Sequence, residues 1–377
     1  MNRASQFRAL FLCTILLIAS IFVLAREHRP SFLRPGLRLY AYVSTADDAV
    51  SVVDLVKLAT VAHVPIGGSI SAMREHPTRA ELWGVSSSGG FAWVLDSRTS
   101  QIAARIPVGA LPYSIDYSPD GKRVYVPASG SNTLTAIDCG TRQIVSHAST
   151  GTQPVAARVS PDGKLVLVLN KKDATVGIYD AATLQLRTTV RVIPDPEDAA
   201  ILNDHSTAFI LSRTQRRLSV IDLPKGVLLT NLELAGIPSQ MILKPDGGEL
   251  YVLSPESHGL QAINTWTHEV GDFLVLGSAP TRGALLADTG GLYVSDASSG
   301  SVIPVDMRFR RLSRPIPAGQ TPGALRFDPG DKARLLLVVS QASGDLSIIR
   351  ITPDRTSALL TMIPVGDQPR ELAVKLF

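Results

Sequence analysis

The strongest constraint on the fold is an acidic residue that returns every 42 positions. In the stretch TLTAIDCGTRQI, Asp138 ends an alternating apolar run, and Thr141 follows three residues later. The same place in the repeat is held, at intervals of 42 residues, by Asp54, Asp96, Asp138, Asp180, Asp222, Asn264 and Asp306. A fixed period of about 40 to 50 residues is typical of a propeller or a solenoid. The chain is therefore interpreted first as a repeat protein.

Two further anchors divide each unit into four short segments. A Gly-x-x-Pro element precedes the first segment, and a Ser-Pro-Asp-Gly turn, as at Ser118 and Ser160, separates it from the second. Runs such as KLVLVLN and GELYVLS alternate with a period of two, which indicates strands rather than helices. The repeated Asp can accept backbone N–H groups of the next turn, so it ends the third strand. The units are predicted to be four-stranded antiparallel meanders.

The two ends of the chain predict that these units close into a ring. The first unit, from Leu37, contains the second, third and fourth strands but lacks the first. The chain finishes with VGDQPRELAVKLF, a Gly-x-x-Pro element followed by one strand, which supplies the missing piece. Closure also removes the exposed edges that a linear stack would leave. We predict an all-β, eight-bladed β-propeller over residues 37–377, with seven blades as the alternative if one degenerate unit forms no blade.

The first 25 residues have the pattern of an export signal. Arg3 and Arg8 precede an uncharged run from Ala9 to Ala25, which is at the lower limit of length for spanning a bilayer. We predict a signal peptide or N-terminal membrane anchor over residues 1–25 and a tether over 26–36. The protein is expected to be exported, periplasmic or at the cell surface, with membrane contact only through residues 9–25 if they are retained.

Charge and cysteine content point to no particular chemistry. The formal net charge is +4, and without Arg3 and Arg8 it falls to +2, with no long block of like charges. A nucleic-acid partner is therefore not expected. Of the two cysteines, Cys13 lies in the leader, so the mature chain keeps Cys139 alone. This excludes a disulfide framework, a CxxCH heme attachment and a cysteine-rich zinc site. Cys139 is interpreted as a turn residue, with an exposed reactive thiol as the alternative.

The combination of SPDG, YV, Asp, Thr and Gly-x-x-Pro resembles the YVTN-type β-propeller repeat family. The matching positions read YVPA at Tyr125, YVLS at Tyr251 and YVSD at Tyr293, so the literal tetrapeptide is absent. The resemblance covers residues 37 to 377 and implies an exported or surface propeller. Similar propellers occur in lactonases of the phosphogluconolactonase kind and in the heme-d1 domains of nitrite reductases. Fold-level kinship carries no function by itself.

Candidate ligand-binding residues follow the Gly-x-x-Pro elements, where they are expected to face the mouth of the central channel. An ordinary YVTN-type repeat has small or apolar residues there, as at Ser71, Val155, Thr281 and Gly323 of this chain. Carboxylates in this position could bind a cation and arginines an anionic ligand, and the alternative is a set of solvated rim charges. The polar candidates are Tyr113, Glu197, Asp198, Gln240, Arg282 and Arg370, with Glu371 next in line.

Other motifs are scarce. No histidine pair has HxH or HExxH spacing, and there is no G-x-S-x-G elbow, P-loop or Rossmann fingerprint. Only His258 is placed for an axial heme ligand at the channel. Two basic stretches, SRTQRRL from Ser212 and MRFRRLSR from Met307, are interpreted as solvated loops, with an acidic partner or lipid headgroups as the alternative.

These observations favour a binding or scaffolding module of the cell envelope over an enzyme. The expected partner is a protein or polymer of the envelope, and the propeller is expected to be monomeric. No cofactor is predicted, although a channel-bound divalent cation is an option. The alternative function is a metal-assisted, lactonase-like hydrolase with Glu197 and Asp198 among the ligands. A redox propeller that carries a cofactor is disfavoured because heme and metal motifs are missing.

Overall fold

The computed structural model describes residues 38–286, 290–330, 335–352 and 356–377. The chain divides into two units, 1–38 and 39–377, and the strands of the described residues lie in the second. The predicted leader (1–25) and tether (26–36) lie outside the described residues. Among the residues that are described, no helix is long and apolar enough to cross a membrane.

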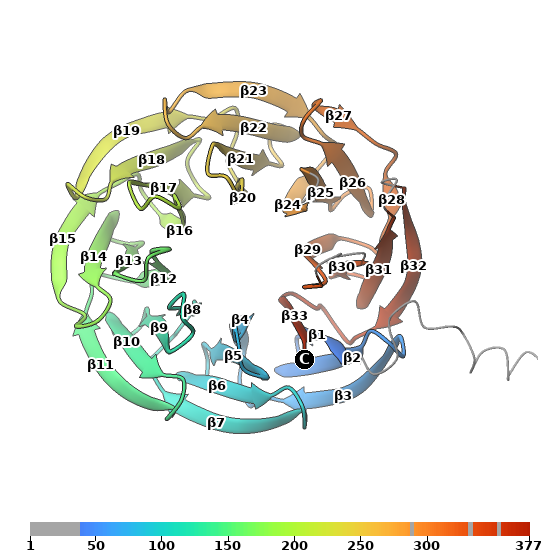
Figure 1. Ribbon diagram of the computed structural model, residues 1–377, viewed down its shortest axis with the longest axis horizontal. Coiled ribbons are helices and arrows are strands. Elements are labelled where there is room, and N and C mark those ends of the chain that lie inside the picture. Colours follow the sequence, from blue (N-terminus) through green and yellow to red (C-terminus); the bar gives the residue numbers. More distant parts are fainter. Residues whose placement is uncertain (1–37, 287–289, 331–334, 353–355) are drawn as a thin grey trace, which may run out of the picture. The chain divides into compact units, whose positions relative to one another are not determined.

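Residues 39–377 form eight antiparallel sheets arranged around a central axis (Figure 1). We number them as blades 1 to 8, blade 1 beginning at β4 and blade 8 combining β33 with β1–β3. The innermost strands are β4 (Ile70–Glu75), β8 (Asp116–Tyr117), β12 (Pro154–Val159), β16 (Pro196–Ile201), β20 (Gln240–Leu243), β24 (Pro280–Leu286), β29 (Pro322–Phe327) and β33 (Leu372–Leu376). The second strands are β5 (Glu81–Ser86), β9 (Arg123–Ala128), β13 (Leu165–Asn170), β17 (Thr207–Ser212), β21 (Glu249–Ser254), β25 (Gly291–Asp296), β30 (Leu335–Ser340) and β1 (Leu39–Ser44).

The third and fourth strands complete each blade toward the outside. The third strands are β6 (Phe91–Asp96), β10 (Thr133–Asp138), β14 (Thr175–Asp180), β18 (Arg217–Asp222), β22 (Gly259–Asn264), β26 (Ser301–Asp306), β31 (Asp345–Ile351) and β2 (Ala49–Asp54). The outer strands are β7 (Gln101–Pro107), β11 (Gln143–Ser149), β15 (Leu186–Arg191), β19 (Val227–Glu233), β23 (Val270–Val275), β32 (Ser357–Pro364) and β3 (Ala59–Pro65). In blade 6 the outer strand is split into β27 (Arg311–Leu312) and β28 (Ile316–Pro317), both paired with β26.

Eight blades are thus confirmed, and the seven-blade alternative is wrong. Closure is as predicted, because β33 pairs antiparallel with β1, from Leu39 opposite Leu376 to Val43 opposite Leu372. The backbone N–H of Ser44 also donates to the carbonyl of Glu371 at 3.1 Å. The last strand of the chain therefore completes the blade that contains the first.

The recurring Asp has the predicted local role. In blade 2, one carboxylate oxygen of Asp138 accepts the backbone N–H groups of Gly140 at 2.9 Å and Thr141 at 2.8 Å. The Thr141 hydroxyl bonds to the same oxygen at 3.1 Å. These bonds satisfy the backbone of the tight turn that leads to the outer strand. The repeated acid is a structural element of the turn.

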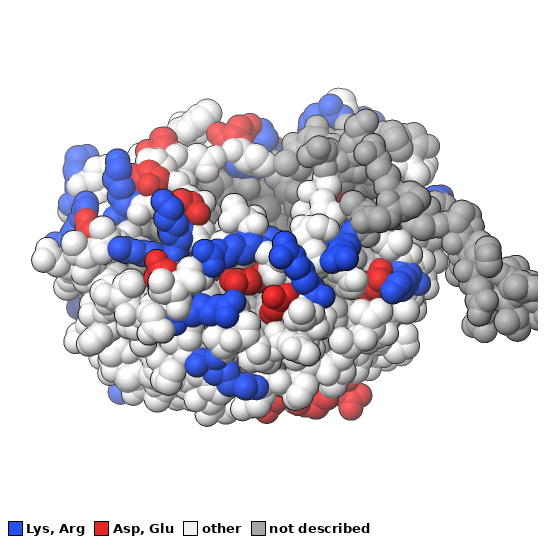
Figure 2. All heavy atoms as spheres, turned by 60° about the horizontal axis from the view of Figure 1, so that its bottom comes forward, with Lys and Arg blue, Asp and Glu red and all other residues white. Residues whose placement is uncertain are grey.

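The apolar core lies between neighbouring blades rather than inside any one of them. Trp83 of blade 1, for example, packs in one buried cluster with Val124 and Ile137 of blade 2. Each sheet thus hides both faces against its neighbours, which is why the units need the ring. On the surface in Figure 2, basic and acidic side chains lie next to one another.

The ring has two faces, which we name by their turns. The Gly-Pro face carries the connections between blades and the turns between second and third strands. The Asp-turn face carries the turns between first and second strands and between third and fourth strands, including the turn after Asp138. The inner strands run from the Gly-Pro face to the Asp-turn face.

Candidate functional site

Side chains of the inner strands alternate between the apolar core and the central axis. Met73 and Met241 are buried to 9 % exposure or less. Arg74, which follows Met73, and Gln240, which precedes Met241, are partly exposed. The polar positions occur at two levels, and the second level lies two residues closer to the Asp-turn face.

At the first level, three predicted residues come together on consecutive strands. Asp198, Gln240 and Arg282 lie opposite Leu211, Leu253 and Ser295, which are successive repeats of one position. Register therefore places these three side chains at one height on blades 4, 5 and 6. This corrects the alignment of Gln240, which counting from the anchor glycine position, 193 or 236, would pair with Glu197. The Pro238 element is one residue shorter, so Ser239 holds that place and Gln240 matches Asp198.

The second level carries polar residues that sequence reasoning missed. Arg74, Asp116, Arg158 and Arg326 lie opposite Trp83, Tyr125, Leu167 and Leu337 on blades 1, 2, 3 and 7. A search that continued to the fourth residue after each anchor proline would have found them. We name Arg74, Asp116, Arg158, Asp198, Gln240, Arg282 and Arg326 the inner-wall belt.

Blades that are polar at one level carry small or apolar residues at the other. Ala72 and Ala156 occupy the first level on blades 1 and 3. Ala200, Ile242 and Ala284 occupy the second level on blades 4, 5 and 6. The inner-wall belt therefore runs nearer the Gly-Pro face on blades 4–6 and nearer the Asp-turn face on blades 7 and 1–3.

Belt side chains contact the neighbouring blade. Arg158 donates from Nε to Oδ1 of Asp198 at 2.9 Å, and its Nη2 lies 2.6 Å from the same oxygen. Arg74 Nη1 lies 3.0 Å from Oδ1 of Asp116. Arg282 Nη1 donates to the carbonyl of Ser239 at 3.0 Å. These bonds connect inner strands directly, so the belt is both a polar surface and a set of inter-blade contacts.

Glu371 of blade 8 lies among the arginines. Burial raises the pKa of its carboxyl even though Arg282, Arg326 and Arg74 attract its negative charge. Burial, together with repulsion from Arg213, lowers the pKa of the Arg282 guanidinium. The inner wall at this point is a desolvated place in which cations outnumber carboxylates.

The remaining predicted residues do not join the belt. Glu197 is bound by Nζ of Lys171 at 2.5 Å and lies 3.3 Å from Nη1 of Arg213. Tyr113 and Arg370 are both exposed. Among the described residues, neither side chain has a hydrogen-bond or ion-pair partner. They lie on blades 2 and 8, and Glu197 lies on blade 4.

Geometry gives no support to the predicted cation site. In the part of the chain that is described, no three His, Cys, Asp or Glu residues lie close enough to hold a metal ion. Both proposed ligands, Glu197 and Asp198, are already neutralised by basic side chains. His258 is exposed on the Gly-Pro face, where its Nδ1 bonds to the carbonyl of Ser278 at 2.7 Å. This bond leaves Nε2 with its lone pair.

Comparisons with known proteins indicate the fold and one family. The chain matches none of the curated proteins. Among solved structures, it resembles dihydro-heme d1 dehydrogenase NirN in complex with DHE, with a TM-score of 0.73 and 16 % identity over 92 % of this chain and 77 % of that one. Hydrazine synthase of Kuenenia stuttgartiensis gives a TM-score of 0.60 and 17 % identity, over 77 % of this chain and 97 % of that one.

Identities this low establish the fold alone. A family model adds more, because the cytochrome D1 heme domain model matches residues 81–269, about half of the chain. The YVTN-type assignment is not confirmed, although that family is also a propeller family. The chain belongs to the cytochrome D1 heme domain family.

Proposed function

We propose that the protein is a binding module for an anionic tetrapyrrole of the heme d1 class, which the inner-wall belt holds by its acid groups. The observation that carries the proposal is the convergence of four arginines, Arg74, Arg158, Arg282 and Arg326, on the central axis. The family match and the resemblance to NirN, whose structure is a complex with DHE, support this class of ligand. The sequence-based expectation of no cofactor therefore gives way to a proposed one.

The charges of the belt favour carboxylates. Its four arginines face two aspartates and the carboxyl of Glu371, so an excess of positive charge remains. Arg326 is exposed and has no ion-pair or hydrogen-bond partner among the described residues. A guanidinium with free donors binds a carboxylate through two parallel hydrogen bonds, and partial burial strengthens them. Alanines at the alternate level, such as Ala156 and Ala284, leave room beside the arginines.

The same strands fit the iron of a heme less well. Heme iron takes axial His, Cys, Met or Tyr ligands, and the eight inner strands contain no His or Cys. Their methionines, Met73 and Met241, are buried in the apolar core, and the hydroxyl of Tyr117 is buried as well. The residues of the inner wall are thus suited to bind the carboxylate groups of the macrocycle rather than its metal. For this reason we propose binding and not heme-dependent catalysis.

A porphyrin titration tests the proposal. Metal-free protoporphyrin IX, which carries two carboxylates, should bind saturably and shift its absorbance band, whereas its dimethyl ester should bind at least tenfold more weakly. Replacing Arg282 and Arg326 together by Ala should weaken binding of the free acid by more than tenfold, since hydrogen bonds to charged groups contribute about 1.5–3 kcal/mol each. The matched control replaces Arg187 and Arg191 on the outer strand β15.

Equal affinity for acid and ester, or equal losses in the two double variants, would overturn the proposal. Iron protoporphyrin should bind no more tightly than the metal-free form, because the inner strands supply no axial histidine.

Export through residues 1–25, to the periplasm or cell surface, remains part of the proposal. Of the functions expected from the sequence, we keep ligand binding. The metal-assisted hydrolase has no supporting cluster in the described residues.

A further inference from the structure

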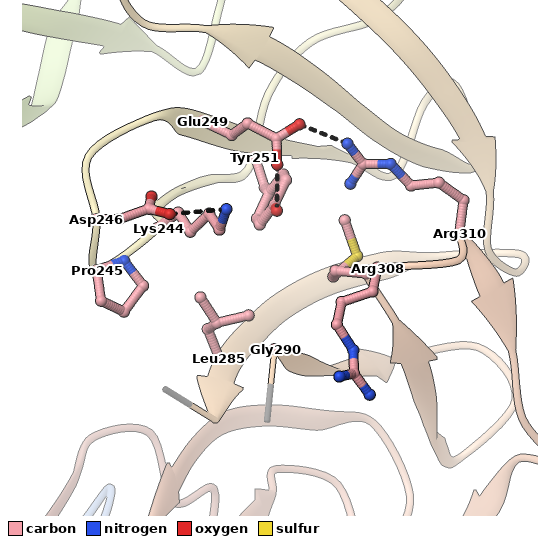
Figure 3. A pocket seen from close by; sticks show the side chains of 10 residues that line it. Lys244, Pro245, Asp246, Glu249, Tyr251, Leu285, Gly290, Arg308 and Arg310 are labelled. Atoms are coloured by element: carbon pink, nitrogen blue, oxygen red, sulfur yellow. Dashed lines mark hydrogen bonds and ion pairs between the residues drawn. The ribbon is translucent and has the colours of Figure 1, made fainter. Parts of the chain in front are cut away.

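A second site lies at the Asp-turn face, between blades 5 and 6, away from the inner-wall belt. A cavity of about 400 Å³ opens there beside the turn Lys244–Pro245–Asp246 of blade 5. Blade 6 contributes Met307, Arg308 and Arg310 from the turn after its third strand. In Figure 3, Lys244 and Asp246 lie on one side of the drawn space, Arg308 and Arg310 lie on the other, and Tyr251 lies between Lys244 and Arg310.

The repeat itself shows that the basic charge of this cavity is not required by the fold. A crevice of the same size occurs three blades earlier, between blades 2 and 3, lined by equivalent residues. There the counterparts of Lys244 and Arg308, each 126 residues earlier, are Ser118 and Ala182. That crevice has basic residues of its own, Lys122 and Arg123, and they equal its carboxylates, Asp120 and Asp162, in number. Two positions that are neutral in that crevice are thus basic in this one. Two carboxylates, Asp246 and Glu249, also line the cavity, so its lining residues carry one more positive than negative charge. Outside the lining, Asp306 lies 3.8 Å from Arg308 and Asp272 lies 4.0 Å from Arg310.

Arg310 anchors the inner end of the cavity. Its Nη2 donates to Oε1 of Glu249 at 2.5 Å, and the Tyr251 hydroxyl donates to the other oxygen of that carboxylate at 2.8 Å (Figure 3). The guanidinium carbon lies 5.5 Å from the centre of the Tyr251 ring. Its Nη1 is buried and has no hydrogen-bond partner among the described residues. A buried N–H donor of a cation that has no acceptor costs free energy, and an acceptor on a ligand would remove that cost.

Blades 1 and 2 contain the same three-residue arrangement. There Arg142 Nη2 donates to Glu81 at 2.9 Å, and Trp83 donates to the same carboxylate at 2.9 Å. Arg79 reaches over that crevice and bonds to the carbonyl of Cys139 at 2.9 Å, and His76 is buried beside it. The Glu–aromatic–Arg arrangement is therefore a packing device of the fold. At blades 5 and 6 a cavity lies beside this arrangement, and Lys244 and Arg308 line it.

We propose that this cavity binds a small organic anion, with a carboxylate or phosphate head and an apolar body. The head would pair with Lys244 and Arg308 and approach Arg310, and the body would contact Leu285 and Met307. In the structure, Lys244 Nζ lies 2.8 Å from Oδ2 of Asp246, whose side chain is 59 % exposed. Because such an exposed ion pair is weak, the ammonium group can leave it for a ligand at little cost in free energy.

Two exposed aromatic side chains neighbour residues of the cavity, although neither is among its lining residues. Trp266 is 71 % exposed and its ring lies against Gly248, next to the cavity residue Glu249. Phe309, between Arg308 and Arg310, is 66 % exposed. Trp266 also provides the assay. The other two tryptophans, Trp83 and Trp93, are fully buried in blade 1, so a ligand that perturbs emission from an exposed indole reports on this site.

The experiment titrates the full chain with hexyl phosphate and hexanoate while Trp266 emission is recorded. Both probes should give saturable changes that are absent from the Trp266→Phe variant. Inorganic phosphate should bind at least tenfold more weakly, and hexanol should give no saturable change. Vesicles containing phosphatidylglycerol distinguish the source of the anion. A blue shift with vesicles as well as with free probes assigns the ligand to a lipid headgroup, and a response to free probes alone assigns it to a soluble compound.

The variants carry a matched control. Lys244→Ala with Arg308→Ala should weaken hexyl phosphate binding by more than tenfold. Arg98→Ala with Lys164→Ala should leave it unchanged, because Arg98 holds the repeat position of Arg308 in blade 1 and Lys164 is an exposed lysine beside a first turn in blade 3. Both doubles remove exposed charges, so their melting temperatures should match. Equal affinities in the two doubles, or equal binding of hexanol, would overturn the proposal.

Discussion

The ion pair between Arg158 and Asp198 joins the two levels of the inner-wall belt, so its strength measures how far the belt holds neighbouring blades together. Both guanidinium contacts are short, at 2.9 and 2.6 Å, and the two side chains are 21 % and 30 % exposed. Exposed pairs contribute about 0.2–1 kcal/mol, and breaking a buried pair costs about 3–5 kcal/mol. For this half-buried pair we expect a coupling energy of about 1–2 kcal/mol.

A double-mutant cycle with Arg158→Met and Asp198→Asn measures that energy by urea unfolding of the full chain. Methionine keeps the apolar stem of the arginine, and asparagine keeps the shape of the carboxylate. The control cycle uses Arg217 and Glu233, whose Nε–Oε1 distance is also 2.6 Å but whose side chains are 53 % and 69 % exposed. That pair should couple by less than about 0.5 kcal/mol. A coupling at Arg158 no larger than the control would refute the view that the belt is desolvated.

The described contacts support three shorter predictions. Burial raises the folded-state pKa of Glu371 above its ordinary 4.5, so the folded chain holds this proton more tightly than the unfolded chain. Stability therefore falls as the pH rises from about 4.5 through the folded-state pKa. Glu371→Gln should therefore gain stability at pH 7 relative to pH 4 in urea melts, and an unchanged pH profile would contradict this. Cys139 is fully buried and desolvation raises its pKa to about 12, so a Cys13→Ser protein should react with a thiol reagent only after unfolding. Deleting residues 372–377 removes the buried Leu372 and Val374 and the pairing with β1. The deletion should lower the unfolding free energy by more than about 5 kcal/mol, as read from thermal melts. A melting temperature within a few degrees of that of the full chain would argue against closure by this strand.

The fold could be predicted from the sequence because the ring repeats its local chemistry. Each third strand ends in a side chain that must satisfy the same backbone groups, so Asp138 and its counterparts recur whatever the neighbouring surface does. The missing first strand of the first unit and the extra strand at the C-terminus then determined the closure. Both are local patterns of the chain, and neither depends on long-range packing detail.

The site was predictable only in part, for a physical reason. Asp198, Gln240 and Arg282 are polar and close to the anchor prolines, so the expectation that such residues face the channel mouth identified them. Arg74 and Arg158 lie deeper, at a height set by strand register and by a bulge after each anchor. Register comes from pairing with the second strand, which a single-strand pattern does not reveal. The short Pro238 element displaced Gln240 by one residue for the same reason.

In a repeat protein, positions that obey the repeat serve the fold, and positions that depart from it are free for function. The inner wall follows this rule, because a blade with an arginine at one level has a small residue at the other. Arg158 on blade 3 reaches Asp198 on blade 4 at the point where the belt changes level. A rigid, planar ligand that contacts arginines on both levels must therefore lie inclined to the axis of the ring. Moving one contact to the other level, by Ala284→Arg with Arg282→Ala, should then weaken protoporphyrin binding although the number of arginines is kept.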